Sequence, residues 1–580
     1  MNKIKFHNSG FEHLRIIFIA MVLLIGQFDS LLTAQTLQWA KRIGGLQHDG
    51  SYSIAVDAQG NVYTVGLFSD TVDFDPGAGF YWLGTEGEQN TYISKLDPQG
   101  NLIWAKQLGQ VQGTLGFSIA LDSLMNVFVA GEFLSTQDFD PGPGTYNLRA
   151  ASEGFFDAFI LKLDSTGTFV WARRFGAALD ENINSICTDS QGNIYLTGDF
   201  AVSVDFDPGP GSHILTSSGN EDAFVCKLSS SGNFMWALSM GGIEEDKGNS
   251  ITIDKESNVY VLGEYQSTVD LNTGPATDSS TALGGSDIFI LKLEPTGEYI
   301  WSKHIGGGHT DYGMSMKADK SGNLFLLGAF LDSADLDPGP GIQMLTSTGY
   351  SDVFVSRLDT SGNLIWVKQF GSTQVEFGHD IDVDANGNVY SIGYFRSSID
   401  FDPGSGTFIL STSSTYDTDV FISVLDIDGN FVWAERMGGT GSDYGRSIAV
   451  DLVGNIYGCG FFNGAASFHS EPSIFLLSAG WNDCFIVKYT GSIVSVTDDF
   501  FENNLSVYPI PAGDYLRLNF GMEIQEAKIE IFNILGTTMH KERILNTGYK
   551  LIDLANFKAG IYILHITNGT KSKCVKFVKE

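Results

Sequence analysis

The sequence predicts an all-β fold: a seven-bladed β-propeller of four-stranded blades, closed by an N-terminal strand and followed by a small Ig-like β-sandwich. The first observation behind this prediction is an internal repeat, because a Trp-containing segment returns every 65 or 67 residues, at Trp39, Trp104, Trp171, Trp236, Trp301, Trp366 and Trp433. A fixed period of this length is typical of one structural unit copied in an array. The second observation is that short alternating apolar runs separate tight-turn residues, without helical periodicity. The third is the number of strands: each repeat has four only if the N-terminal strand completes the last repeat and the chain closes into a ring.

Each repeat reads as four antiparallel strands, which we call a to d. In the first full unit, two tight turns with Gly at the position of positive φ, Asp57–Asn61 and Asp97–Asn101, join a to b and c to d. A longer connection through Asp73–Gly77 joins b to c. The expected strands cover residues 53–57, 61–68, 91–97 and 102–106.

The strand count indicates how the ring closes. Strand a recurs seven times, at Ser53, Ser118, Ser185, Ser250, Ser315, Asp380 and Ser447. The Trp strand that follows strand c occurs only six times, because the chain runs from the seventh strand c into Tyr489 without another Trp. The missing strand is present at the other end, in Leu37–Ile43. We therefore expect this segment to complete the last blade, which favours a closed propeller over an open solenoid.

Composition narrows the classes of function. The formal net charge of −34 argues against a nucleic-acid partner, since such a chain has little with which to neutralise phosphates. The five cysteines, Cys187, Cys226, Cys459, Cys484 and Cys574, show no C-x-x-C spacing, so neither a zinc site nor a disulfide framework is indicated. Cys459 and Cys484 are expected to lie on paired strands, as a disulfide or as two buried thiols.

Residues 1–34 have the pattern of a signal peptide. Lys3, Lys5 and Arg15 precede the apolar run 16–25, and small residues ending at Ala34 give a cleavage site before Gln35. The apolar run is too short for a comfortable membrane span, and a retained anchor is the alternative. The pattern predicts an exported mature protein without a stable transmembrane span.

Acidic residues recur in the b–c and d–a loops, which strand order places on one face. The b–c loops carry Asp-x-Asp pairs: Asp73 and Asp75, Asp138 and Asp140, Asp205 and Asp207, Asp335 and Asp337, Asp400 and Asp402. The d–a loops add an acid four residues before the strand-a position: Asp49, Glu181, Asp246, Asp311, Glu376 and Asp443. For the Asp-x-Asp pairs we keep three hypotheses: caps of the turns before Pro-Gly, Ca²⁺ ligands, and residues that contact a ligand directly.

Catalytic motifs are scarce. The sequence contains no Gly-x-Ser-x-Gly elbow, no His-Glu-x-x-His and no phosphate-binding loop. His48, His309 and His379 are expected in d–a loops on the acidic face, either near the channel mouth or as exposed loop residues. No catalytic residue and no certain cofactor is assigned; Ca²⁺ is the one candidate.

The repeats end near residue 490, residues 491–503 read as a linker, and residues 504–580 form a second unit. Alternating segments in this unit predict strands within 505–511, 515–519, 527–532, 561–566 and 574–579, as in a small β-sandwich. Its ten Lys and Arg against seven Asp and Glu give it a net charge of +3, unlike the acidic repeats.

Two family resemblances follow from these motifs. Units of the form Gly-Asn-x-Tyr-x-x-Gly-x-Phe, Asp-x-Phe-x-x-Lys-Leu-Asp and Gly-Asn-x-x-Trp-Ala, covering Leu37 to Tyr489, resemble the bacterial β-propeller repeat family SBBP. The Leu-Asp-x-x-Gly-x-x-x-Trp turn resembles the tryptophan-docking motif of quinoprotein dehydrogenases, which implies that the Trp residues lock neighbouring blades.

The C-terminal unit resembles the sorting domain of the type IX (Por) secretion system. The matching residues are Tyr508, Pro509, Pro511, Gly536, Gly560, Tyr562, Lys576 and Lys579, while Ile510 stands where the family usually has Asn. The resemblance implies the type IX machinery as partner, passage through the periplasm and outer membrane, and cleavage of the tail. An ordinary Ig-like module is the alternative.

These predictions together suggest an exported, surface-attached or secreted monomer that binds a glycan, protein or matrix ligand without catalysis through its acidic loop face. The alternatives are a secreted hydrolase or lyase with its site at the channel mouth, and a structural surface-layer component.

Overall fold

The structure is a computed structural model that describes residues 35–85, 89–109, 113–274, 276–414, 416–468, 474–490, 506–508, 515–533, 538–558, 560–568 and 571–579. The described residues form β-strands, turns and irregular segments and include no α-helix. The predicted signal peptide with Ala34 and the linker lie outside the described residues. The chain divides into two compact units, Met1–Ser492 and Ile493–Glu580.

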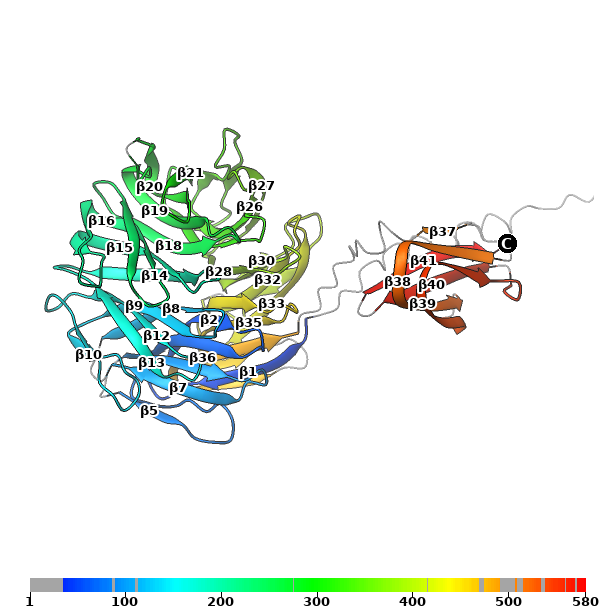
Figure 1. Ribbon diagram of the computed structural model, residues 1–580, viewed down its shortest axis with the longest axis horizontal. Helices are drawn as coiled ribbons and strands as arrows, with labels where there is room; N and C mark the ends of the chain where they lie inside the picture. The colour runs from blue at the N-terminus through cyan, green and yellow to red at the C-terminus, as the bar shows by residue number, and fades with distance from the viewer. Residues whose placement is uncertain are drawn as a thin grey trace, which may run out of the picture. The chain divides into compact units, whose positions relative to one another are not determined.

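The first unit contains four-stranded antiparallel groups, each of which we call a blade, and the described residues form seven of them. Each blade pairs its strands in the order a, b, c, d, as the turn pattern predicts. The innermost strands a are β2 (Gly50–Val56), β8 (Thr114–Leu121), β14 (Glu181–Thr188), β18 (Asp246–Ile253), β22 (Asp311–Ala318), β28 (Phe377–Val383) and β34 (Tyr444–Val450). Each of them contacts the next, and β34 contacts β2, so that they form a closed ring; β2, β8, β14, β18 and β28 are labelled in Figure 1. Residues from all seven strands line one cavity, which we call the central channel.

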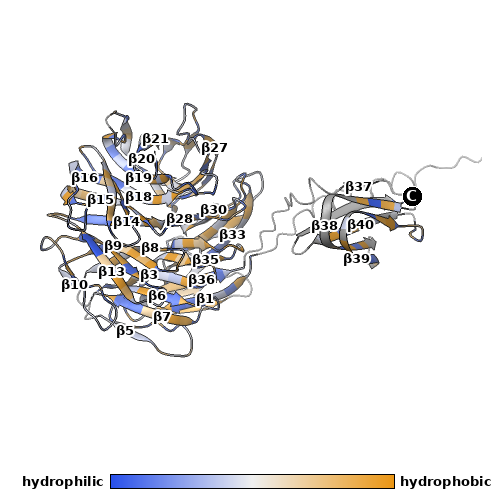
Figure 2. Cartoon of the chain, in the orientation of Figure 1, coloured by the Kyte–Doolittle hydropathy of each residue, from blue (hydrophilic) through white to orange (hydrophobic). Residues whose placement is uncertain are grey.

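Strands b and c form the buried middle of each blade. Strands b are β3 (Val62–Phe68), β9 (Val127–Phe133), β15 (Ile194–Asp205), β19 (Val259–Asp270), β23 (Leu324–Phe330), β29 (Val389–Phe395) and β35 (Ile456–Ser467). Strands c are β6 (Asn90–Leu96), β12 (Asp157–Leu163), β16 (Ile214–Leu228), β20 (Ser279–Leu293), β26 (Asp352–Leu358), β32 (Asp419–Leu425) and β36 (Phe475–Tyr489). Hydrophobic residues concentrate in these strands (Figure 2).

The outermost strands d carry the repeated tryptophans. They are β7 (Leu102–Leu108), β13 (Phe169–Phe175), β17 (Phe234–Met240), β21 (Tyr299–Gly307), β27 (Leu364–Phe370), β33 (Phe431–Gly439) and, in the last blade, β1 (Leu37–Ile43). β1 pairs with β36 from Leu37 opposite Tyr489 to Ile43 opposite Cys484. The N-terminal strand therefore lies against the last strand c, more than 400 residues later in the chain.

The tryptophans connect each blade to the next. The Trp39 indole donates a hydrogen bond to the Pro98 carbonyl at 3.1 Å, and the Trp236 indole does the same to Pro295. A Cβ atom on Gly100, whose φ is +77°, would lie 3.1 Å from the Trp39 ring. The c–d turn of each following blade thus needs a glycine both for its backbone conformation and to accept the indole.

Small hairpins extend the b–c connections, where the sequence predicted only a loop. They pair β4 (Thr71–Asp73) with β5 (Trp82–Gly84), β10 (Thr136–Asp138) with β11 (Asn147–Arg149), β24 (Ser333–Asp335) with β25 (Met344–Thr346) and β30 (Ser398–Asp400) with β31 (Ile409–Ser411). In the other blades the same pairing occurs within the long strands b and c. The repeated Pro and Gly residues concealed these three-residue strands.

Cys459 and Cys484 do not form a disulfide. They lie on neighbouring strands, but Cys459 pairs with Ile486 and Cys484 with Phe461. Both side chains are fully buried free thiols, as are those of Cys226 and, less completely, Cys187. Of the two alternatives for this pair, the buried thiols are correct.

The second unit has its own core. β38 (Tyr515–Asn533) pairs with β37 (Ser506–Tyr508), β39 (Thr538–Asp553) and β40 (Gly560–Asn568), and β40 pairs with β41 (Lys571–Lys579). Apolar side chains from β38, β39 and β40 form one buried cluster, which includes Leu518, Ile529, Ile552 and Leu564. This cluster is the hydrophobic core of the second unit.

Candidate functional site at the channel mouth

The Asp-x-Asp pairs of the b–c loops cap the hairpin turns in which they lie. Asp73 Oδ1 accepts hydrogen bonds from the amides of Asp75 and Tyr81, and Asp75 Oδ1 accepts one from Gly77. The same three bonds recur around Asp138 and Asp140, Asp205 and Asp207, Asp335 and Asp337, and Asp400 and Asp402. Each pair thus satisfies three backbone donors of its own loop.

Calcium binding by these pairs stays a prediction. In the described part of the chain, no group of three or more His, Cys, Asp or Glu side chains is arranged to hold a metal ion. Asp205 and Asp207 line a hollow of about 350 Å³ together with Arg173 and Arg174, whose positive charges oppose a cation there. Each remaining pair offers at most the oxygens that its turn leaves free.

The acids of the d–a loops are buried, which corrects the expectation of an acidic binding face built from them. Their exposed fractions do not exceed 2%, and each carboxyl group caps backbone amides; Asp49, for example, accepts from Gly45 and Ser69. Burial raises the pKa of Asp49, Asp246, Asp311 and Glu376 to about 7, and of Glu181 and Asp443 to about 8. These groups hold the loops and are not available to a ligand.

The three histidines have separate environments. His48 is exposed in its loop with its ring 5.0 Å from that of Trp481. His309 is also exposed and lies 3.7 Å from Asp332. His379 belongs to β28 instead of a loop, where burial lowers the pKa of its imidazole well below the usual range. Only His379 lies on an innermost strand.

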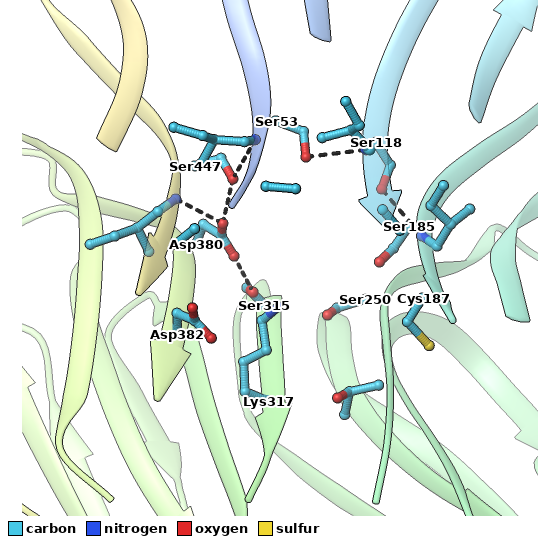
Figure 3. Close-up of a pocket in the computed structure, with 18 of the residues that line it drawn as sticks. Ser53, Ser118, Ser185, Cys187, Ser250, Ser315, Lys317, Asp380, Asp382 and Ser447 are labelled. Carbon is cyan, nitrogen blue, oxygen red and sulfur yellow. Dashed lines mark hydrogen bonds between the residues drawn. The ribbon is translucent and has the colours of Figure 1, made fainter. Parts of the chain in front are cut away.

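A ring of hydroxyl groups, the serine ring, lines the channel at the strand-a positions. The hydroxyl oxygens of Ser53, Ser118, Ser185, Ser250 and Ser447 each accept an amide hydrogen from the next innermost strand. In the sixth blade Asp380 replaces Ser and accepts the amide of Ile448 and the hydroxyls of Ser315 and Ser447 (Figure 3). The ring ties successive blades together around the channel.

Two residues further along these strands, the channel departs from the repeat. Lys317 and Asp382 occupy positions held elsewhere by Ala55, Ala120, Cys187, Thr252 and Ala449, and all of them line a cavity of about 330 Å³ (Figure 3). Burial lowers the pKa of Lys317, but Asp382 and Asp380 outweigh it and raise the pKa overall. The channel interior therefore holds opposite charges in its fifth and sixth blades.

The largest departure from the repeat lies at the other end of the innermost strands, where the d–a loops enter. We call this region the channel mouth; it comprises the residue before each serine-ring position and the cross-strand pair at the start of strand a. The residues before the ring are Tyr52, Phe117, Asn184, Asn249, Met314, His379 and Arg446. The pairs are Gly50–Leu67, Leu115–Glu132, Asn182–Asp199, Lys247–Glu264, Tyr312–Ala329, Phe377–Tyr394 and Tyr444–Phe461.

One side of the mouth is an aromatic wall that runs from the fifth blade to the second. Its members are Tyr312, Phe377, Tyr394, Tyr444, Phe461, Tyr52 and Phe117, and consecutive ring centroids lie 4.9–6.4 Å apart. Arg446 lies over the rings of Tyr52 and Phe461, at 5.4 and 5.3 Å from their centroids. All these side chains are half-buried, so each keeps part of its surface open.

The opposite side is a polar wall in the second to fourth blades, formed by Glu132, Asn182, Asn184, Asp199, Lys247, Asn249 and Glu264. The Asp199 carboxylate accepts hydrogen bonds from the side-chain amides of Asn182 and Asn184, and the Glu264 carboxylate accepts one from the side-chain amide of Asn249. Burial, reinforced by Asp199, raises the pKa of Glu132 to about 8, and burial raises the pKa of Glu264 to about 7. A hollow of about 380 Å³ lies beside Lys247, Glu264 and Tyr312, where the two walls meet.

Sequence reasoning missed the mouth because it followed the conserved positions of the repeat. Function in an array of similar units resides where one unit differs from the next, and the repeat itself hides such positions. Alignment of the seven copies on the serine ring would have shown the change from aromatic to polar residues directly. The same alignment would have shown Lys317 and Asp382.

The residues matched to the sorting domain lie in or near the strands of the second unit. Tyr508 ends β37, Gly560 and Tyr562 lie in β40, and Lys576 and Lys579 lie in β41. The Tyr562 hydroxyl donates to the Lys558 carbonyl at 2.9 Å, and Lys579 is buried. Pro509, Pro511 and Gly536 lie outside the described residues.

Comparison with family models agrees with the resemblances to the SBBP repeat and to the type IX sorting domain. The model of the secretion system C-terminal sorting domain matches residues 506–580. The model of the SBBP β-propeller repeat matches residues 170–199, 365–394 and 432–460. The chain carries SBBP propeller repeats and a type IX sorting domain. Each matched SBBP segment runs from a Trp strand through the d–a loop into strands a and b, and so includes one sector of the mouth.

Curated relatives share the sequence at low identity. A WD repeat-containing protein of Acanthamoeba polyphaga mimivirus is 21% identical, over 82% of this chain and 40% of its own length. The regulatory protein FlaEY of Caulobacter vibrioides is 22% identical, over 45% of this chain and 28% of its own length. The chain thus spans less than half the length of these relatives.

A solved gluconolactonase from Xanthomonas campestris aligns with 60% of this chain and 96% of its own, at 11% identity and a TM-score of 0.24.

Among the described residues, no helix is long and apolar enough to cross a membrane. The sorting domain supports export, with a secreted or cell-surface destination for the protein.

Proposed function

We propose that the mature protein is a secreted or surface-attached binding or scaffold protein that holds a glycan, protein or matrix ligand at its channel mouth. In this proposal the first unit is a seven-bladed propeller latched by its N-terminal strand, and the second is an Ig-like sandwich that directs the chain to the type IX machinery. The sorting-domain match and the repeat matches support the exported propeller.

The observation that carries the binding role is the break in the repeat at the mouth. The turns, the tryptophans and the serine ring are repeated because every blade needs them for packing. The mouth residues are not needed by every blade, since Gly50, Leu115, Asn182, Lys247, Tyr312, Phe377 and Tyr444 all occupy the same position. Half-buried aromatic and polar side chains around one opening are typical of a ligand site.

The proposal is tested with purified mature chain on an array of glycans and extracellular-matrix proteins. We expect a ligand whose retention is lost in the double variant Tyr394→Ala, Glu132→Gln. The matched control is Gln59→Ala, Gln99→Ala, which changes two turns on the opposite face. Binding that survives the mouth variant, or the absence of any ligand on the array, would contradict the proposal.

A hydrolase or lyase at the same mouth is the second candidate function, and Glu132 favours it. A carboxyl group with its pKa raised to about 8 is protonated near neutral pH and suits a general acid. Incubation of a bound ligand with the protein distinguishes the two functions: turnover that stops in Glu132→Gln while binding persists supports the enzyme, and an unchanged ligand supports the binding protein.

A further inference from the structure

We propose that the ligand of the channel mouth is an uncharged oligosaccharide, whose sugar rings stack on the aromatic wall while their hydroxyl groups bond to the polar wall. This inference rests on the proposed binding role of the mouth and adds the chemical class of the ligand. A sugar unit is itself two-sided, with apolar C–H faces and a polar rim of hydroxyls. The mouth has the same division, with rings on one side and amide and carboxyl groups on the other.

The aromatic wall supplies a continuous apolar surface. Tyr394 and Tyr444 have ring centroids 4.9 Å apart, Tyr444 and Phe461 5.0 Å apart, and none of the three is fully buried. Aromatic side chains contribute large contact areas at low conformational cost, and tyrosine adds a hydroxyl group at its polar end. A chain of sugar rings can therefore contact several members of this wall at once.

The polar wall offers both donors and acceptors, as a polyhydroxylated ligand requires. Asn182 Oδ1 is a buried polar atom of this wall without a hydrogen-bond partner among the described residues, and across the mouth His379 Nε2 and Arg446 Nε are two more. In the same part of the chain, no hydrogen bond to the Glu132 carboxyl group is found, which leaves both of its oxygens for a ligand. Buried polar groups left without partners are costly, so a ligand that completes their bonds gains affinity.

The charges of the mouth favour a neutral ligand over a basic peptide. The cation Lys247 interacts with the carboxyl groups of Asp199 and Glu264, and the raised pKa values of Glu132, Asp199 and Glu264 reduce the negative charge further. Lys247 also lies 3.4 Å from the Glu221 carboxyl group, and this ion pair neutralises part of the negative charge within the protein. An incoming ammonium or guanidinium group would meet the positive charge of Lys247 already in place.

The hollow where the two walls meet can hold the terminal sugar unit of the ligand. It has a volume of about 380 Å³ and is lined by Lys247, Glu264, Gln266, Thr310 and Tyr312, among others. Its lining unites charged, amide, hydroxyl and aromatic groups within one opening. We therefore place one sugar unit in this hollow and its neighbours along the aromatic wall.

The test is isothermal titration of the full mature chain with neutral hexasaccharides of glucose, xylose and mannose, and separately with a basic peptide of alternating Lys and Phe. We expect at least one hexasaccharide to bind, and Tyr394→Ala and Glu132→Gln each to weaken it about tenfold, as the loss of one good contact does. Trp82→Ala is the matched control, because Trp82 is 59% exposed and stacks on Phe80 in the β4–β5 hairpin, which contains none of the mouth residues. This variant should bind within about twofold of wild type.

The outcomes separate the two levels of the proposal. Binding of the peptide alone, lost in Glu132→Gln, would overturn the saccharide but leave a binding mouth. Saccharide binding lost only in Trp82→Ala would place the site on the hairpin and overturn the mouth itself. Failure of every hexasaccharide at millimolar concentration overturns the saccharide inference. Glu132→Gln keeps the test valid if Tyr394→Ala lowers the melting temperature, because Glu132 makes no hydrogen bond within the described chain.

Discussion

Buried carboxyl groups occur in pairs at the junctions between blades. Burial raises the pKa of the acid in each of six d–a loops, and an Asp on the preceding strand c raises it further. The pairs are Asp157–Glu181, Asp222–Asp246, Asp287–Asp311, Asp352–Glu376, Asp419–Asp443 and Asp483–Asp49. Three of these pairs have a guanidinium partner, from Arg174, Arg436 or Arg42. At the junction between the first two blades, Asn90 and Thr114 occupy the same positions without charge.

Asp222→Asn should stabilise the protein, and more at pH 8 than at pH 5. Burial raises the pKa of Asp222 and raises that of Asp246 to about 7, so the folded state retains protons that the unfolded state loses above pH 4. The stability that these groups contribute is therefore full below pH 4 and is lost as pH rises toward 7 or 8. Asparagine removes one of the repelling charges, and we expect a gain of about 1 kcal/mol at pH 8 in thermal denaturation.

Asp157→Asn is the control for this prediction. It makes the same chemical change but breaks the 2.8 Å ion pair with Arg174, and should therefore destabilise the protein. An Asp222→Asn variant whose melting temperature follows pH in parallel with wild type would contradict the role of the carboxyl pair.

At the scale of elements, the order of the strands could be predicted from the sequence, but the short hairpin strands and the residues of the channel mouth could not. The Asp-x-x-Gly-Asn turns specify their own geometry: Asp57 accepts the amides of Gln59 and Asn61, and Gly60 has a φ of +81°. Local chemistry of this kind is legible in sequence. The repeated Pro and Gly residues conceal the three-residue strands β4 and β5. The mouth is formed by side chains from blades far apart in the sequence, which a consensus of the repeat does not record.

Deletion of Leu37–Ile43 should destabilise the protein more than loss of any single internal tryptophan. β1 supplies a full strand against β36, the Trp39 indole bonded to Pro98, and Arg42 paired with the buried Asp483. An internal Trp104→Ala removes one side chain, at a cost of about 3–5 kcal/mol, but leaves the strand pairing intact. The deletion also exposes the edge of β36 to other chains.

Thermal denaturation of the two variants measures this difference. We expect the deletion to melt well below Trp104→Ala and to aggregate on unfolding, whereas Trp104→Ala should refold. Val170→Ala is a control for a surface change in an outer strand, since 47% of this side chain is exposed. Equal melting of the deletion and Trp104→Ala would refute the N-terminal latch.

At the scale of the molecule, stability and function are assigned to different positions of the same repeat. Strands b and c are buried in every blade and supply the core. The hydrophobic clusters around Trp171 and Phe354 each join two neighbouring blades. Such packing tolerates variation at the ends of strands, where side chains meet solvent instead of another blade. Under the proposed function, the mouth can change its ligand without changing the fold, and the family match identifies the architecture and not the ligand.

Truncation after Ser492 should separate folding from export. The second unit buries its own cluster around Leu518 and Ile529, and the chain divides between Ser492 and Ile493. The truncated chain should melt within about 2 °C of the first transition of the full chain, because it loses none of the blade packing. It should accumulate in the periplasm, because residues 506–580 match the sorting domain.

Cell fractionation and calorimetry measure the two effects, and residues 504–580 fused to a periplasmic carrier provide the reciprocal control. Truncated chain at the cell surface or in the medium would show that export does not depend on this unit, while a lower melting temperature would show that the first unit depends on the second for its stability.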